Sequence, residues 1–211
     1  MKIDDLTPVA QDYIKAIWSA AEWAGKPPSA AALAERFGTS RAAVTDTVKR
    51  LAAQGLVVHQ PYKPLALTEQ GCALAVQMVR RHRVIETFLV RHVGYSWEEV
   101  HDEAERLEHA VSDRLIARID ALLGHPTEDP HGDPIPRENG SFSAAETPSR
   151  ILADCAPGEW VRVLRVSDGD PQTLMRAAQL ELLPGRDVLI DADLLANELV
   201  AKAVRVAAAG D

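Results

Sequence analysis

The sequence predicts a mainly α-helical fold with small β parts, arranged as successive segments along the chain. Apolar residues recur at helical spacing through most of residues 6–123. Short β-type runs bounded by Gly or Pro interrupt these helices, and a Pro-rich stretch precedes a β-rich C-terminal part. The chain has 211 residues, 46% of them hydrophobic, which suits one large or two small domains.

The first segment, residues 1–70, is predicted to contain three helices followed by two short strands. In chain order the elements are a helix over 6–24 ended by Gly25, a helix over 30–37 capped by Ser29, a helix over 41–54 begun by Thr39 and Ser40, and strands over 56–59 and 65–68 around the turn 60–64. Two short helices joined by a tight turn and followed by a β-hairpin are typical of a winged helix-turn-helix.

The second helix of such a motif lies in the major groove of DNA and contacts base edges through its N-terminal side chains. Residues expected to contact bases or phosphates are Ser40, Arg41, Ala42, Thr45, Asp46, Thr47, Lys49 and Arg50 on this helix and its cap, with Tyr62 and Lys63 on the wing. One copy carries few basic residues, so tight binding would require a dimer. The alternative is a small helical bundle with a solvated polar face.

The middle segment, residues 71–124, is predicted to be two helices. The first runs from Glu69 to about Val93 and ends at Gly94. Ser96 and Glu99 fit a capping box for a second helix over about 97–123. Residues 125–149 form a Pro-rich linker, and residues 150–211 form a small β-rich domain around strands 160–166 and 187–190, a helix over 172–180 and a last segment over 199–207.

Polar side chains on the two middle helices could bind a metal ion. His101, Glu105, Glu108 and His109 fall within an arc of about 100° on a helical wheel, and His82 and Glu86 repeat the pattern on the preceding helix. Asp12 on the first helix offers a further carboxylate. Such groups are costly to bury without a partner. Carboxylate and imidazole donors suit Mn(II) or Fe(II) in an octahedral-like site and are too oxygen-rich for structural zinc.

Other interpretations of these residues remain open. The stripe could form surface salt bridges with Arg80, Arg81, Arg83 and Arg106. A metallohydrolase is weakly supported, because the chain has neither an H-E-x-x-H pattern nor a G-x-S-x-G nucleophile, and we expect no enzyme. A metal-independent winged-helix regulator that senses an organic ligand would leave the polar stripe unexplained.

Composition and charge limit the classes of protein further. The formal net charge is −8, but residues 1–75 carry +1 while residues 96–150 carry −8. The front of the chain is therefore near-neutral to basic, and the acidic middle either repels anions or binds cations. No stretch is long and apolar enough to span a membrane, and the acidic N-terminus does not resemble a signal peptide, so we expect a cytoplasmic protein. Cys72 and Cys155 form neither a disulfide framework nor a zinc motif.

Three segments that follow the winged helix carry a family resemblance: RRHRVIETFL, VHDEAERLEH and HGDPIP. With these segments the chain resembles the iron/manganese-dependent transcriptional repressors, the family of the diphtheria toxin repressor. The resemblance covers essentially the whole chain. It implies a homodimer that binds double-stranded operator DNA when loaded with divalent metal, takes no small organic substrate and represses metal-uptake genes. It also implies dimerisation through the middle helices and an SH3-like C-terminal domain over residues 150–211.

The resemblance implies two metal sites in each subunit. The ligands of the primary site would be Asp12, Glu105, Glu108 and His109. The iron-responsive members have Met and Cys where this chain has Asp12 and Glu105, and hard oxygen donors favour Mn(II), with Fe(II) as the alternative. The second site would hold His82, Glu86 and His101, closed by Asp170 with Gln172 as a spare, and His131 matches a linker ligand of some members.

Two residues depart from the family pattern. Lys15 occupies a position where the compact manganese regulators carry a second acidic residue, which favours two separated sites over a tightly coupled binuclear site. Asp46 stands where relatives often carry an amide or a basic side chain, so their operator sequence is not transferable to this chain.

Overall fold

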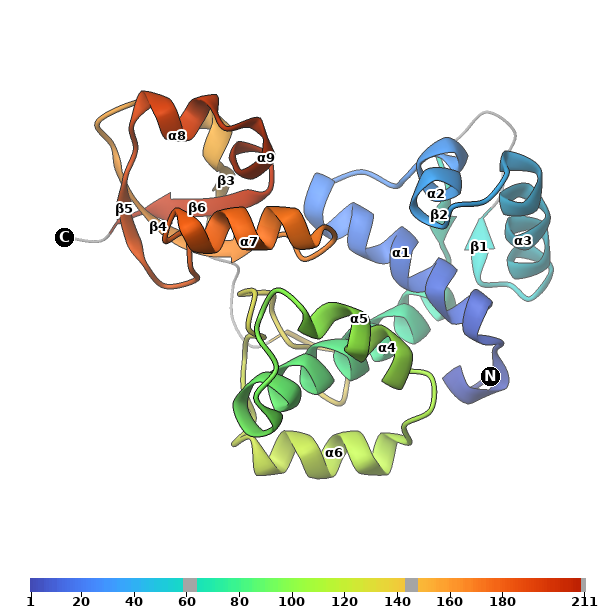
Figure 1. Cartoon of the computed structure of the whole chain (residues 1–211). Helices are drawn as coiled ribbons and strands as arrows, with labels where there is room; N and C mark the ends of the chain where they lie inside the picture. Colours follow the sequence, from blue (N-terminus) through green and yellow to red (C-terminus); the bar gives the residue numbers. More distant parts are fainter. Residues whose placement is uncertain (59–63, 143–147, 210–211) are drawn as a thin grey trace. The chain divides into compact units, whose positions relative to one another are not determined.

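The computed structural model describes residues 1–58, 64–142 and 148–209. The chain forms two compact units (Figure 1). The first unit comprises Met1–Arg81 with Glu138–Gly140, and the second comprises His82–Arg137 with Ser141–Asp211. Among the described residues, no helix is both long and apolar enough to cross a membrane.

The first unit confirms the predicted order of three helices and two strands. After a short 3-10 turn, η1 (Ile3–Asp5), its elements are α1 (Pro8–Ala24), α2 (Ala30–Arg36), α3 (Arg41–Ala53), β1 (Val57–Val58), β2 (Ala66–Leu67) and the beginning of α4 (Glu69–Phe88). Thr7, Ser29 and Ser40 each cap a helix by accepting a backbone N–H. Gly25 ends α1 in the left-handed conformation, as its position predicts.

The core of the first unit joins its helices to the small hairpin. Ile14, Leu33, Val48 and Leu56 are among its buried members. β1 and β2 pair antiparallel, with Val57 opposite Leu67, which gives the wing predicted from the sequence. Most of the predicted turn between the strands lies outside the described residues, and Tyr62 and Lys63 lie there with it.

The second unit begins within α4, which continues into a π-helical turn, η2 (Leu89–Val93), and stops at Gly94 in the left-handed conformation. This end agrees with the predicted helix from Glu69 to about Val93. Figure 1 shows α5 (Val100–Leu107) and α6 (Asp113–Leu122) on either side of α4. Their apolar faces pack together through residues such as Ile85, Val100 and Ile116.

The prediction of one continuous helix over 97–123 is wrong. The helix starts later, at Val100, although the backbone N–H of Ser96 does bond to the Glu99 side chain at 3.3 Å. A turn after Leu107 separates α5 from α6, and Ser112 caps α6 by accepting the N–H of Leu115 at 3.3 Å. A competing N-cap signal therefore ended the helical pattern that the apolar spacing suggested.

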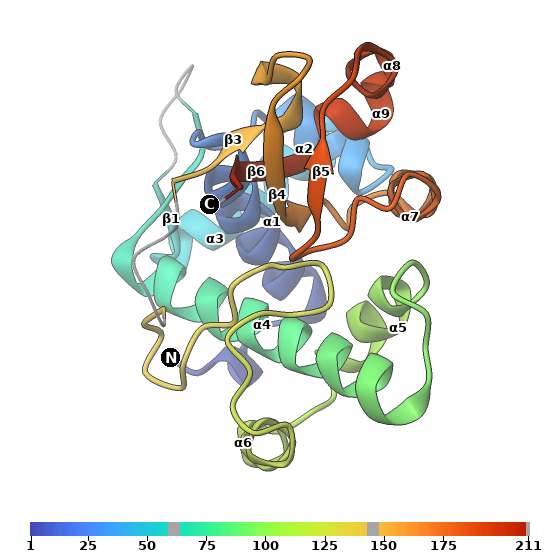
Figure 2. The ribbon, with the colours of Figure 1, turned by 90° about the vertical axis from the view of Figure 1, so that its left-hand side faces the viewer.

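The C-terminal part of the second unit is a four-stranded antiparallel sheet with the order β3-β6-β4-β5. Its strands are β3 (Arg150–Ile151), β4 (Trp160–Val166), β5 (Asp187–Leu189) and β6 (Val204–Ala208), and Figure 2 shows them side by side. The short helices η3 (Leu152–Asp154), α7 (Pro171–Gln179), α8 (Ala192–Ala196) and α9 (Glu198–Ala201) accompany the sheet. The predicted last segment over 199–207 is thus divided between α9 and β6, because the chain turns before it joins the sheet.

Candidate metal centre and DNA-contact helix

The DNA-contact residues predicted on α3 lie mostly on its exposed side. Ser40 is the N-cap, with its Oγ 3.1 Å from the Ala43 nitrogen. The exposed side chains on the helix are those of Arg41, Ala42, Asp46, Lys49 and Arg50, and Thr45 is half-buried. Because these residues follow the N-terminus of the second helix of the motif, they are placed as base-contacting residues are in helix-turn-helix proteins.

Thr47 does not fit the predicted set. Its side chain is only 7% exposed and belongs to the buried side of α3. Its hydroxyl accepts a hydrogen bond from the Arg50 guanidinium at 3.0 Å. Position 47 is one residue past exposed Asp46, which places it about 100° around the helix and against the core. Thr47 is therefore a positioning partner of Arg50 rather than a phosphate ligand.

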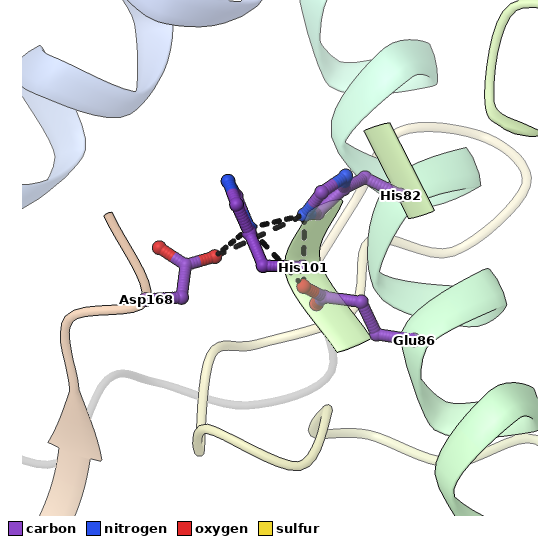
Figure 3. Close-up of side chains that lie close together, drawn as sticks. All are labelled: His82, Glu86, His101 and Asp168. Carbon is purple, nitrogen blue, oxygen red and sulfur yellow. Dashed lines mark hydrogen bonds and ion pairs between the residues drawn. The ribbon is translucent and has the colours of Figure 1, made fainter. Parts of the chain in front are cut away.

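Four side chains from three parts of the second unit converge on one point (Figure 3). His82 and Glu86 are one turn apart on α4, His101 lies on α5, and Asp168 follows β4. His82 Nε2 lies 2.9 Å from Glu86 Oε1 and 3.1 Å from His101 Nδ1. His101 Nδ1 lies 3.0 Å from Asp168 Oδ2. We call this group of four residues the His82 cluster.

The spacing of these donor atoms fits a divalent cation. Two further separations are longer: His82 Nε2 lies 3.8 Å from Asp168 Oδ2, and His101 Nδ1 lies 3.4 Å from Glu86 Oε1. Ligands bound at about 2.1 Å to one ion lie about 3.0 Å apart when adjacent in an octahedron. Two imidazole nitrogens and two carboxylate oxygens are donors that Mn(II) and Fe(II) accept. The residues present therefore fit a resident metal ion.

The outer nitrogens of both histidines face carboxylates. His82 Nδ1 lies 2.6 Å from Glu108 Oε2, and both side chains are buried. His101 Nε2 lies 3.6 Å from Glu105 Oε1. A carboxylate behind an imidazole fixes the ring orientation and the tautomer that offers the other nitrogen to a metal. The His82 cluster thus has the outer support that metal-binding histidines usually have.

The His82 cluster brings imidazole and carboxylate groups of opposite charge together where they are largely buried. Burial disfavours the charged form of His101, but the charge and hydrogen bond of Asp168 outweigh it and raise the pKa of His101 to about 9. Burial likewise opposes ionisation of Glu86 and of Asp168, yet the neighbouring imidazoles hold the pKa of each carboxyl well below its ordinary value. In the metal-free protein, the proton that this raised pKa keeps on His101 offsets part of the carboxylate charge.

Asp168, rather than the predicted Asp170, closes the cluster. The Asp170 carboxylate caps α7, where it accepts the backbone N–H of Gln172 at 3.1 Å and the hydroxyl of Thr173 at 2.9 Å. The side chain of Gln172 is exposed and takes no part in the cluster. An Asp before Pro171 is a common N-cap pattern, and this signal in the sequence distinguishes Asp170 from Asp168.

His131, the remaining candidate from the Pro-rich segment, is fully buried on the other side of Glu86. Its Nδ1 lies 3.7 Å from Glu86 Oε2, and its Nε2 lies 2.6 Å from the carbonyl oxygen of Trp97. Asp129, which the sequence analysis did not single out, has a carboxylate oxygen within 4.8 Å of ligand atoms of both Glu86 and His131. The pattern D-P-H, with an acid two residues before a histidine, was the only signal for it.

The proposed primary ligands come from both units. In the first unit, Asp12 lies half-buried on α1, one turn from Lys15, which is 5% exposed. In the second unit, Glu105 is half-buried on α5, and Glu108 and His109 follow the end of that helix. His109 Nε2 lies 3.8 Å from Glu108 Oε1. The joint role of these four residues stays a prediction.

Two family models match this chain in succession. Residues 5–65 match "Iron dependent repressor, N-terminal DNA binding domain", and residues 68–137 match "Iron dependent repressor, metal binding and dimerisation domain". The iron-dependent repressor IdeR of Mycobacterium leprae is 35% identical over 169 residues, which cover 80% of this chain and 70% of that protein. IdeR of Mycobacterium tuberculosis is 39% identical over 134 residues, covering 64% of this chain and 58% of that protein.

Solved structures resemble the chain over nearly its whole length. A manganese-dependent transcriptional repressor in complex with manganese is 42% identical, with a TM-score of 0.82 over 95% of this chain and 100% of that one. The manganese regulator SloR is 30% identical, with a TM-score of 0.77 over 97% of this chain and 100% of that one. Relatives named as transcriptional repressors are not enzymes, in agreement with the sequence analysis. The chain belongs to the iron-dependent repressor family of metal-dependent transcriptional repressors.

Proposed function

We propose that this chain is a Mn(II)-dependent, homodimeric repressor that binds operator DNA when loaded with metal and controls manganese-uptake genes. The observation that carries the proposal is the His82 cluster, whose nitrogen and oxygen donors converge at distances suited to one divalent cation. Such a repressor acts where the genomic DNA is, so the cytoplasm is its proposed location.

The choice of Mn(II) rests on the kinds of donor present. The His82 cluster contains no sulfur, and the proposed primary set has carboxylates at Asp12 and Glu105. Hard oxygen donors select less strongly for the later transition metals than thiolate or thioether sulfur does. Two structural neighbours are named as manganese repressors or regulators, which supports the same choice.

Fe(II) is the second candidate for the activating metal. Several curated relatives are named iron-dependent repressors, and imidazole with carboxylate also suits Fe(II). The two candidates are distinguished by measuring which metal, Mn(II) or Fe(II), gives DNA binding at the lower free metal concentration.

The proposed mechanism is a change in population between two states of the dimer. When bound, the metal ion supplies positive charge that neutralises the clustered carboxylates. Asp12, Glu105, Glu108 and His109 would hold it in the primary site, and the exposed face of α3 would contact the operator. Metal binding then favours the state with the higher metal affinity. Because that state also binds DNA more tightly, the apparent DNA affinity of the protein rises by linkage. A dimer presents two copies of α3 to the two half-sites of an operator.

The test uses variants of the primary set in a pull-down of sheared genomic DNA. With Mn(II) present, wild-type protein should enrich a few discrete fragments, while Glu108→Ala and His109→Ala should not. Asp102→Asn is the matched control, because Asp102 is an exposed acid on the same helix and should behave as wild type. If both site variants enrich the wild-type fragments in response to Mn(II), the assignment of these residues is wrong.

A further inference from the structure

The C-terminal sheet ends in an open edge strand. β5 is the last strand in the order β3-β6-β4-β5, and Figure 2 shows it at the margin of the sheet, on the side of α7. The Arg186 carbonyl and the Ile190 N–H bond, at 2.8 and 2.9 Å, to the backbone of the neighbouring segment 159–163. Because backbone groups alternate in direction along a strand, Asp187 and Leu189 direct their N–H and C=O groups away from β4. Such outward groups can pair with one more extended chain.

A groove follows this edge. Its volume is about 430 Å³, and its walls are Trp160 of β4, residues 179–181 at the end of α7, and residues 186–189, which include β5. Side chains alternate between the two faces of a strand, so Leu189 stands on one face of the sheet and Val188 on the other. Because side chains of both faces line the same groove, the groove runs along the open edge of β5 rather than across one face.

Two exposed apolar side chains lie next to each other at this groove. Trp160 is 60% exposed and Leu189 is 47% exposed, and the two are directly opposite each other in the pairing of β4 with β5. Opposite residues of an antiparallel pair have their side chains on the same face and in contact range. A large aromatic side chain exposed beside a leucine is typical of surfaces that a partner covers. This patch predicts an apolar side chain on the added strand, opposite Leu189.

The charges at the groove favour one acidic residue in the partner. Arg186 is exposed, and within the described part of the chain it makes no ion pair and no side-chain hydrogen bond. The carboxylate of Asp187 is already bound, because its two oxygens accept from Arg162 at 2.7 and 2.8 Å. The charge of Asp187 is therefore matched, whereas that of Arg186 is available to an anion. Glu181 on the opposite wall disfavours a second acid.

We propose that the edge of β5 binds an extended peptide segment of another protein, which adds to the four-stranded sheet as a fifth strand. The peptide pairs antiparallel with β5, and it carries an apolar residue opposite Leu189 and, three positions later, an acidic residue opposite Arg186. Main-chain hydrogen bonds to Asp187 and Leu189 give affinity, and the two side-chain contacts give selectivity. β5 contains neither Pro nor Lys, the residues that commonly protect an edge strand. The inference goes beyond the proposed function, because neither the metal ligands nor α3 takes part in it.

The test uses the full-length protein and the synthetic peptide acetyl-TVTVET-amide, in which the first valine and the glutamate have the required spacing. Amide hydrogen exchange followed by nuclear magnetic resonance reports on each N–H of β5. At about 90% saturation with peptide, exchange at Asp187 and Leu189 should slow by about tenfold, because these N–H groups become hydrogen-bonded. Exchange at Val188, whose N–H already faces β4, should change little.

Modified peptides test whether the backbone carries the binding. The backbone nitrogens of the two valines would face β5, so N-methylation of both should abolish binding. N-methylation of the threonine between them, whose nitrogen would face away from β5, is the matched control and should leave binding intact.

Protein variants test the charge contact. Arg186→Glu should weaken binding of the peptide by about fivefold, the equivalent of about 1 kcal/mol for an exposed ion pair. A peptide with lysine in place of glutamate should bind this variant more tightly than it binds wild type. Arg36→Glu, which changes an exposed arginine on α2, is the matched control and should bind the original peptide as wild type does.

Three results would each overturn the proposal: no binding of the peptide at millimolar concentration, unchanged exchange at Leu189, or equal affinity for the peptide methylated at its valines. Protection of the Leu189 amide that rises with protein concentration in the absence of peptide would also overturn it, because a second copy of the chain would then occupy the edge. Metal-dependent DNA binding is measured separately in the pull-down, so failure of this proposal leaves the proposed function untouched.

Discussion

Replacement of Gly132 by alanine should destabilise the second unit and displace the turn that carries Asp129 and His131. Gly132 has a φ of +85°, and a Cβ there would lie 2.0 Å from the Leu164 carbonyl oxygen. That atom belongs to the backbone of β4, so no side-chain rotation relieves the contact. The turn would have to move, and the hydrogen bond from the Val166 nitrogen to the His131 carbonyl oxygen, 2.9 Å long, would be strained or broken.

The expected magnitude combines two costs. A left-handed conformation for a residue with a Cβ costs about 1–2 kcal/mol. Overpacking against a well-packed backbone adds about 1–3 kcal/mol. Gly132→Ala should therefore cost about 2–5 kcal/mol. Gly158→Ala is the matched control, because its φ is +91° but nothing lies within 4 Å of its Cβ position. It should show only the conformational cost, about 1–2 kcal/mol.

The assay is thermal unfolding followed by circular dichroism in chelator. For a chain of this size about 1 kcal/mol corresponds to about 3 °C, so Gly132→Ala should melt about 3–9 °C below Gly158→Ala. Equal melting temperatures in the two variants would refute the close approach of this turn to β4.

Three further predictions follow from the same structure. Asp168→Ala should reduce Mn(II) binding at the His82 cluster, as measured by equilibrium dialysis. Asp170→Ala should leave Mn(II) binding unchanged but should lower the free energy of unfolding by about 1 kcal/mol through loss of the α7 cap, as measured by thermal unfolding. Because the folded-state pKa is about 9 for His101 and about 10 for His131, both above the ordinary value, the metal-free protein should lose stability as pH rises from about 6.5 toward 10. A melting temperature in chelator that stays level or rises over this range would contradict the charge arrangement of the cluster. Ser112→Ala should lower the stability of the second unit by about 1 kcal/mol through loss of the α6 cap, and Ser112→Thr should restore most of it.

The sequence predicted the helices of the first unit well, because local signals determine them. Ser29 and Ser40 cap the helices that their positions indicated, and Gly25 ends α1 as expected. The same kind of signal at Ser112, an N-cap, divides the helical pattern into α5 and α6. Apolar periodicity alone cannot reveal such a break, since both helices pack against the same core.

The candidate site was predictable where its residues share a helix and less so elsewhere. His82 and Glu86 follow from i, i+4 spacing on α4, and His101 from the next helix. The choice between Asp168 and Asp170 depends on which carboxylate caps α7, and the structure gives that role to Asp170. Asp129 became recognisable only through the turn at Gly132, whose approach to β4 is a tertiary contact without a local sequence signal.

The central claim is that metal loading controls DNA binding. The most direct measurement is the pull-down of sheared genomic DNA by wild-type protein with added Mn(II), with anaerobic Fe(II) and with chelator. The account predicts discrete fragments at low Mn(II) concentration, weaker enrichment with Fe(II) and none with chelator. Equal enrichment under all three conditions would contradict it and would leave the His82 cluster as a structural group of ion pairs.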